Sequence, residues 1–258
     1  MSGRPVPQIQ EPAAEHTHTV IFLHGGGSDG PQFWRAIRRR RPSLFAKFPS
    51  FRWVFPSSGL LWSSSMEMER KQWLDASPRD SSESAQEIPG LSSSVEYVLR
   101  LIEEEVQRLG GRADKLVLGG LSQGQATSLY ALLRCEHRLG AYVGMSGWLP
   151  LAHKLDQGTL KEGDLQGAEA TPVFLGHGTH DRKVPLELAL RARHVLSTNM
   201  NVDVTWRQYV GAKLDGHWIK EPEELEDVAE FLQAKLQLEE YNAPSQNQTS
   251  LPKDTCLI

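Results

Sequence analysis

The stretch from Lys115 to Cys135, KLVLGGLSQGQATSLYALLRC, constrains the fold more than any other part of the chain. It opens with the apolar run Leu116–Leu118 and passes through Gly120-Leu121-Ser122-Gln123-Gly124 into apolar residues at helical spacing. The pattern predicts a strand, a sharp turn and a helix, with Ser122 at the turn. A G-x-S-x-G sequence in this context is typical of a nucleophile elbow, in which the glycines relieve crowding and leave the serine Oγ exposed above the sheet.

The same five-residue pattern occurs again at Gly26-Gly27-Ser28-Asp29-Gly30. Pro31 suits the first position of a helix, so we expect the helix to begin after this motif and Ser28 to lie in a loop. Ser122 is therefore the better candidate nucleophile. The loop also satisfies G-x-G-x-x-G, but a dinucleotide site needs an acidic residue about 20 positions later. The next predicted strand ends at Val54-Phe55-Pro56-Ser57-Ser58 without one, which argues against that cofactor.

Length and composition predict one globular domain. The chain has 258 residues, of which 39% are hydrophobic and 23% are charged, and its formal net charge is −4. We expect the domain at residues 18–239, between a flexible N-terminal lead at 1–17 and a polar C-terminal tail at 240–258. The negative charge and the lack of a dense basic stripe predict no nucleic-acid partner.

The sequence also carries signals about the cellular location of the protein. No apolar run approaches about 18 residues, so no transmembrane segment is predicted, although transient contact with a membrane surface stays open. The N-terminus lacks the apolar core of a signal peptide, and Cys135 and Cys256 do not suggest a disulfide scaffold. A cytoplasmic location is the simplest prediction, and the oligomeric state is left undecided.

Hydrophobic patterning predicts an α/β fold with a mostly parallel central sheet and helices on both faces. Stretches 57–90 and 151–170 show no clear period and are expected to be irregular. Active groups in such sheets gather at the carboxyl ends of the strands. The predicted strands are 19–24, 51–55, 116–118, 140–146, 171–177 and 202–209, and the predicted helices begin near 31, 91, 123, 186 and 221.

A serine at an elbow needs a general base, and the base needs an orienting acid, in the chain order Ser, Asp or Glu, His. His217 lies in the loop after the last predicted strand, just before the final helix. Asp181 lies one strand earlier, in the loop after His177. Asp215 is a competing acid, but it is only two residues from His217 and poorly placed to address the far ring nitrogen. The predicted catalytic residues are therefore Ser122, Asp181 and His217.

Two backbone amides should stabilise the oxyanion: the amide after the nucleophile, at Gln123, and one from the loop after the first strand, for which we select Gly26. A metal site is poorly supported. His177, His180 and Asp181 could be drawn as ligands, but a loop cluster without a further paired carboxylate is weak evidence for a metal site. Neither a metal nor a cofactor is predicted.

The order of motifs resembles the acyl-protein thioesterase, or phospholipase/carboxylesterase, family of α/β-hydrolases from about Val20 to Leu236. The shared motifs are VIFLHGGGSDG, FPSS, WLD at Trp73–Asp75, GGLSQG, SGWLPL at Ser146–Leu151 and HGTHDRKVP. The resemblance implies an α/β-hydrolase fold and assigns Ser122 as nucleophile, Asp181 as acid and His217 as base. It also implies that the amides of Gly26 and Gln123 form the oxyanion hole and that no cofactor is used.

The resemblance implies a serine hydrolase that cleaves acyl thioesters or carboxylic esters, on acylated proteins or on small acyl esters. Trp148, Leu149 and Trp73 are candidates for the acyl-binding site. Members often carry Leu where Gly26 stands and Gly where Gln125 stands, and residues 213–216 also differ. A small-molecule carboxylesterase or lysophospholipase is therefore an alternative, and so is a catalytically silent binding protein of the same fold.

Overall fold

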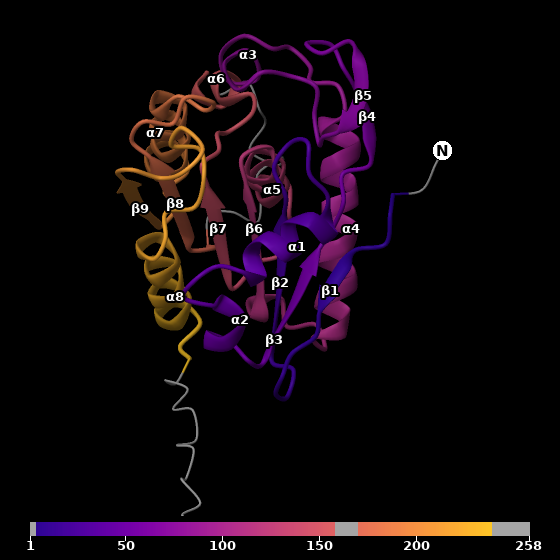
Figure 1. Cartoon of the computed structure of the whole chain (residues 1–258), viewed down its shortest axis with the longest axis vertical. Coiled ribbons are helices and arrows are strands. Elements are labelled where there is room, and N and C mark those ends of the chain that lie inside the picture. The colour runs from indigo at the N-terminus through magenta and orange to yellow at the C-terminus, as the bar shows by residue number, and fades with distance from the viewer. Residues whose placement is uncertain (1–3, 158–169, 239–258) are drawn as a thin grey trace, which may run out of the picture.

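The computed structural model describes residues 4–157 and 170–238, and its centre is a seven-stranded sheet (Figure 1). The strand order is β1-β3-β2-β6-β7-β8-β9, and every neighbouring pair is parallel except β1 and β3. This confirms the predicted fold class. The strands are β1 (Gln8–Gln10), β2 (His18–Leu23), β3 (Phe51–Phe55), β6 (Leu116–Leu121), β7 (Ala141–Met145), β8 (Val173–Gly178) and β9 (Val204–Tyr209).

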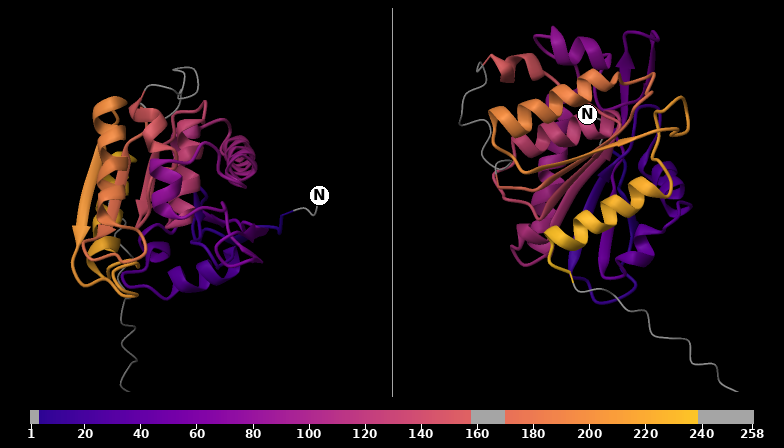
Figure 2. Two further views of the ribbon diagram at one scale, coloured as in Figure 1. Left: turned by 90° about the horizontal axis from the view of Figure 1, so that it is seen from above. Right: turned by 90° about the vertical axis from the view of Figure 1, so that its left-hand side faces the viewer.

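Helices cover both faces of the sheet, and Figure 2 shows α7 and α8 on opposite sides of it. In β2, Ile21 and Leu23 pack into one core while Val20 and Phe22 pack into the other, as expected of a strand buried on both faces. One face carries α4 (Leu91–Arg108), α5 (Gln123–Leu133) and α7 (Leu186–His194), and the other carries α1 (Gly30–Arg38), α2 (Leu44–Lys47) and α8 (Glu223–Lys235).

The first helix begins where its sequence signals place it. Asp29 caps α1, because its Oδ1 accepts a hydrogen bond from the Gln32 amide at 2.8 Å. Pro31 occupies the first turn, where its missing N–H costs nothing. The cap fixes the end of the glycine loop that joins β2 to α1.

The prediction of a flexible N-terminal lead is wrong at Gln8–Gln10. This segment forms β1 and pairs antiparallel with β3, with Gln8 opposite Phe55 and Gln10 opposite Trp53. Gln10 also accepts a hydrogen bond from the Trp34 indole at 3.2 Å. The strand is three polar-flanked residues at the sheet edge, too short to show a hydrophobic period. The predicted tail at 240–258 lies outside the described residues.

The stretch 57–90 is more regular than predicted. It contains a hairpin of β4 (Leu60–Ser63) and β5 (Met68–Lys71), followed by α3 (Pro78–Glu83). The large apolar side chains of the hairpin face solvent, so they give no core pattern; Leu60, Trp62, Met66 and Met68 are all more than half exposed.

Three further elements complete the described chain. The predicted polar loop at 151–170 contains α6 (Ala152–Asp156), while its positions 158–169 lie outside the described residues. A 3₁₀ turn at Ala113–Lys115 leads into β6, and a π-helical turn at Val195–Asn199 follows α7. Across 4–157 and 170–238, no helix has the length and apolar character needed to cross a bilayer.

Candidate active site

Ser122 stands between the end of β6 and the start of α5, as the elbow pattern predicts. Its backbone is strained, with φ 58° and ψ −122°. A Cβ on Gly120 would lie 2.3 Å from the backbone carbon of Gly124, and a Cβ on Gly124 would lie 2.3 Å from the Leu23 carbonyl oxygen. Both motif glycines are therefore required for the turn to approach β2 and α5.

The structure brings the three predicted catalytic residues into one hydrogen-bonded chain. His217 Nε2 lies 2.9 Å from Ser122 Oγ, and His217 Nδ1 lies 2.7 Å from Asp181 Oδ2. Ser122 follows β6, Asp181 follows β8, and His217 lies between β9 and α8, all at the carboxyl edge of the sheet. When Nδ1–H donates to Asp181, Nε2 is free to accept the serine proton.

Asp181 is held as a carboxylate. Its Oδ1 accepts hydrogen bonds from the amides of Lys183 at 2.8 Å and Val184 at 2.9 Å. Burial by itself would raise the pKa of Asp181, but the hydrogen bonds from His217 and the two amides outweigh burial, so the pKa lies below its ordinary value. A negative charge is therefore present to orient the imidazole and to stabilise its protonated form.

The two other histidines near Asp181 have further partners, and His177 Nε2 also lies 3.5 Å from Asp181 Oδ2. His177 Nε2 lies 2.9 Å from the Val184 carbonyl oxygen, and burial lowers the pKa of His177, which favours its neutral form. His180 Nδ1 bonds the Thr179 hydroxyl at 2.8 Å. Among the residues described, no group of three His, Cys, Asp or Glu side chains is arranged to hold a metal ion.

The loop that carries His217 is a tight turn against the Asp181 loop. Leu214, Asp215 and Gly216 all have positive φ, at 53°, 57° and 84°. A Cβ on Gly216 would lie 2.6 Å from the His180 carbonyl carbon, so this close approach needs glycine. The Asp215 carbonyl accepts the Arg182 amide at 3.1 Å. The unusual residues 213–216 therefore form the turn, and the carboxylate bonded to His217 is that of Asp181 and not that of Asp215.

The two predicted oxyanion donors lie side by side. A Cβ on Gly26 would be 3.1 Å from the side-chain amide carbon of Gln123, and a Cβ on Gly25 would be 3.4 Å from Ser122 Cβ. Within the described chain, neither the Gly26 amide nor the Gln123 amide donates to a protein acceptor. Gln123 is also the first residue of α5, where the helix dipole is positive. Both N–H groups are available to a ligand oxygen.

Sequence reasoning missed the residues that hold the oxyanion loop. Burial lowers the pKa of His24 to about 4, so the ring is neutral. Its Nδ1–H donates to the Gly25 carbonyl at 2.8 Å, and its Nε2 accepts the Ser58 amide at 3.1 Å. The Trp73 indole donates to the His24 carbonyl at 2.8 Å. The only sequence signals were the histidine before three glycines and the W-L-D motif.

The Gln123 side chain ties the elbow to the same region. Its Oε1 accepts the Trp73 amide at 3.2 Å, and its Nε2 donates to the Leu74 carbonyl at 3.3 Å. Gln125, one of the departures expected from the resemblance, is buried behind the elbow. Its side chain packs on Gly144 and Gly147, where an added Cβ would lie 2.9 and 2.5 Å from Gln125 atoms. This departure therefore leaves the triad geometry intact.

The predicted acyl-site residues lie in the hydrophobic core. The exposed fractions are 0% for Trp73 and Leu149 and 1% for Trp148. The Trp148 indole donates to Ser81 Oγ at 2.7 Å, which fixes it beneath α3. In this conformation, Trp148 and Leu149 offer no surface to an acyl chain.

Comparison with known proteins gives the same family as the motifs. The family model "Phospholipase/Carboxylesterase" matches residues 4–236. Acyl-protein thioesterase 1 of Gibberella zeae is 34% identical, with 91% of this chain and 97% of that protein covered. Acyl-protein thioesterase 1 of Yarrowia lipolytica is 30% identical, with 90% and 98% covered.

A solved structure agrees. The crystal structure of Zea mays acyl-protein thioesterase 2 superposes with a TM-score of 0.71 at 26% identity, covering 89% of this chain and 98% of that one. This chain therefore belongs to the phospholipase/carboxylesterase family of α/β-hydrolases, a family of serine hydrolases.

Proposed function

We propose that this protein is a serine hydrolase of the acyl-protein thioesterase type, which cleaves acyl thioesters or carboxylic esters through an acyl-enzyme on Ser122. The observation that carries the proposal is the continuous hydrogen-bonded chain from Ser122 Oγ through His217 to Asp181, at 2.9 and 2.7 Å. These distances meet the geometric requirement for a nucleophile, a base and an orienting acid.

Each group then has a role in the reaction. His217 Nε2 takes the proton of Ser122 as its oxygen attacks the acyl carbonyl carbon, and the amides of Gly26 and Gln123 stabilise the oxyanion. The thiol or alcohol leaves with the proton from His217. A water molecule, deprotonated by the same nitrogen, attacks the acyl-enzyme and releases the acid. The Asp181 carboxylate stabilises the imidazolium in both steps.

The first substrate class that we propose is an S-acylated protein. It is supported by the two fungal relatives named acyl-protein thioesterase 1, which align over almost their whole length. We place the reaction in the cytoplasm, and the buried free thiol of Cys135 suits a reducing compartment.

A second candidate is a small-molecule carboxylesterase or lysophospholipase. The burial of Trp148 and Leu149 favours this second candidate, because these side chains can contact a long acyl chain only if they first move out of the core. Short oxyesters need no such movement.

The test is turnover of matched thioesters and oxyesters, from acetyl to palmitoyl. Ser122→Ala should lower kcat by roughly 10⁶-fold. Ser28→Ala, the serine of the other G-x-S-x-G sequence, is the matched control and should keep turnover. Rates that rise with chain length and favour thioesters support the first candidate, whereas activity confined to short oxyesters supports the second.

A catalytically silent binding protein would behave differently. It would show no Ser122-dependent turnover, and Ser122 would not react with a fluorophosphonate. That pair of results would refute the proposed function.

A further inference from the structure

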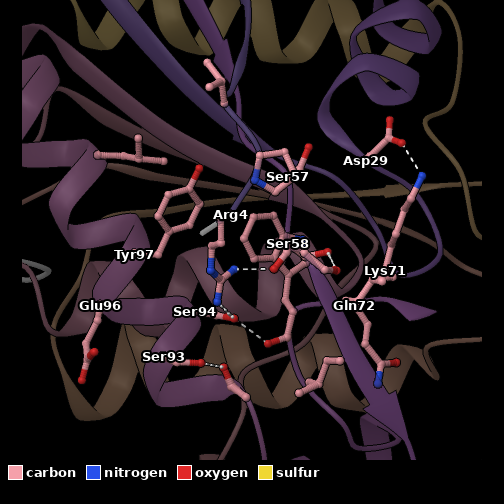
Figure 3. A pocket seen from close by; sticks show the side chains of 18 of the residues that line it. Arg4, Asp29, Ser57, Ser58, Lys71, Gln72, Ser93, Ser94, Glu96 and Tyr97 are labelled. Carbon is pink, nitrogen blue, oxygen red and sulfur yellow. Dashed lines mark hydrogen bonds and ion pairs between the residues drawn. The ribbon is translucent and has the colours of Figure 1, made fainter. Parts of the chain in front are cut away.

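A cavity of about 970 Å³ lies away from the triad, between the β4–β5 hairpin, the N-terminal segment and the first half of α4 (Figure 3). Its lining comes from residues 4–6, 57–61, 71–73 and 90–104, with Asp29 and Pro31. Ser122, Asp181, His217 and Gly26 do not line it. The volume is at the upper end of the range of about 300–1,000 Å³ that is usual for small-molecule sites.

Arg4 lies in this cavity without a carboxylate partner in the part of the chain that is described. Its guanidinium carbon stands 5.6 Å from the Trp73 ring centre and 4.8 Å from that of Tyr97. Nη1 donates to the Ser58 carbonyl at 2.7 Å and Nη2 to Ser94 Oγ at 3.0 Å (Figure 3). A guanidinium has five N–H donors, so three remain for a ligand.

The other charges of the cavity leave this cation uncompensated. Burial, together with the nearby charge of Arg100, lowers the pKa of Arg4, although the guanidinium stays charged at neutral pH. The Asp29 carboxylate is already paired with Lys71 Nζ at 2.5 Å. Glu96, Arg100 and Glu104 also line the cavity, but all three are exposed and their charges are screened by solvent.

A second group in the wall also lacks a partner. The Tyr97 hydroxyl is buried and forms no hydrogen bond among the described residues. Burial raises the pKa of Tyr97, so the hydroxyl keeps its proton and remains a donor. The wall of the cavity therefore combines a positive charge with a buried hydroxyl donor that has no partner among the described residues.

Another part of the cavity lining is apolar. Leu60, Leu61, Leu101 and Val6 contribute to its lining. Leu60 is 65% exposed and Val6 is 88% exposed, so a hydrocarbon chain laid across them would remove apolar surface from water. A ligand with one anionic end and one apolar end matches both parts.

We propose that this cavity binds an amphipathic anion, specifically a long-chain carboxylate whose head group pairs with Arg4 and whose chain lies along Leu60 and Leu61. The site is separate from the triad and goes beyond the proposed function. The assignment rests on the chemistry of the cavity and does not require that the protein hydrolyse anything.

Trp73 lines the cavity and also holds the oxyanion loop by hydrogen bonds. The Trp73 amide and indole donate to Gln123 Oε1 and to the His24 carbonyl. Substitutions around Arg4 can therefore alter turnover without any ligand being involved. Binding must be measured directly, in a full-length chain that does not turn over.

The experiment is calorimetric titration of Ser122→Ala with dodecanoate below its micelle concentration. We expect one dodecanoate per chain, with dodecanol and dodecyltrimethylammonium binding at least about tenfold more weakly, because they lack the charge-assisted hydrogen bond. Arg4→Gln in the same background should weaken dodecanoate by a similar factor, and Arg4→Lys by less. Arg193→Gln is the matched control, because Arg193 is an arginine of α7 that lies outside the cavity, with its guanidinium carbon 6.0 Å from the ring centre of Trp206 on β9. The Arg193→Gln chain should bind dodecanoate normally.

Two results would overturn the proposal. One is equal binding of dodecanoate to the Arg4→Gln chain when its circular dichroism shows a native fold. The other is loss of binding when Ser122 of the wild-type chain carries an alkylphosphonate, which would place the carboxylate in the acyl site of the triad. Failure of Ser122 to react with the phosphonate would contradict the proposed function alone, and the Arg4 comparison would still decide this proposal.

Discussion

Asp181 and Asp215 show how position on the backbone separates two nearby carboxylates. Asp181 Oδ1 faces two amide donors while its Oδ2 faces the His217 ring. Asp215 is nearer to His217 in the chain, but its backbone is committed to the left-handed turn that brings the histidine into place. Only the first carboxylate can fix the tautomer of the imidazole.

We expect Asp181→Asn to lower kcat by about 10⁴-fold with little change in KM, because an amide favours the wrong histidine tautomer without removing the side chain. Steady-state kinetics on the best ester substrate measures this. Asp215→Asn is the matched control and should stay within a few-fold of wild type. An active Asp181→Asn enzyme would show that another group orients His217.

The triad could be predicted from the sequence because its signals are local. Each residue follows a recognisable strand, and chain order assigned the three roles, which remain predictions until kinetics are measured. The acyl-site candidates, which stay predictions, were chosen without knowledge of their burial. Trp148 is fixed by Ser81, which is 67 positions away in the chain, and no local pattern reveals such a contact. The neutral His24 was missed on the same ground, since its partner Ser58 is 34 positions away.

At the scale of elements, the β6–α5 unit is the most strongly determined part of the chain. Glycines join its buried strand, its strained serine and its helix, and the lack of a side chain on these glycines lets the backbone of β2 pack directly against the turn. The elements missed in the sequence have weak patterns for physical reasons. The β1 strand is a short edge strand, and the apolar side chains of the β4–β5 hairpin face solvent instead of a core.

We expect Gly124→Ala to destabilise the fold by at least about 1–3 kcal/mol and to abolish labelling of Ser122 by a fluorophosphonate. The added carbon would lie 2.3 Å from the Leu23 carbonyl oxygen and 2.6 Å from that of His24, and backbone cannot move aside as a side chain can. Gly26→Ala is the comparison, because its nearest contact is the end of the Gln123 side chain at 3.1 Å. Thermal unfolding of both variants measures the difference, and equal melting temperatures would contradict this account.

At the scale of the whole molecule, one buried carboxyl group makes stability depend on pH. Glu224 on α8 is 1% exposed, and its Oε2 accepts the Lys220 amide at 2.8 Å. Its Oε1 has no partner among the described residues and packs against Gly176 of β8. Burial raises the pKa of Glu224 from 4.5 to about 8.

The sign of the effect follows from proton binding. Between pH 4.5 and about 8 the folded chain keeps a proton on Glu224 that the unfolded chain loses, so the stability from this group is full below pH 4.5 and lost as pH rises through about 8. Glu224→Gln removes this dependence. Its unfolding free energy relative to wild type should rise steadily from pH 5 to pH 8, by on the order of a few kcal/mol, and its melting temperature should rise with it.

Thermal melts across this pH range measure the effect. Glu223→Gln is the matched control, since the Glu223 side chain is 52% exposed on the same helix turn. Parallel curves for wild type and Glu224→Gln would show that Glu224 is ionised in the folded protein.

The separation of the triad along the chain also bears on when the protein can become active. Ser122 and His217 are 95 positions apart, and the strands β7, β8 and β9 lie between them. During synthesis the elbow can form soon after α5 has left the ribosome, but its serine has no base until the loop after β9 emerges. The nascent chain therefore carries an inert serine while the next 95 positions are made, and hydrolysis becomes possible only after all strands of the described sheet have been synthesised.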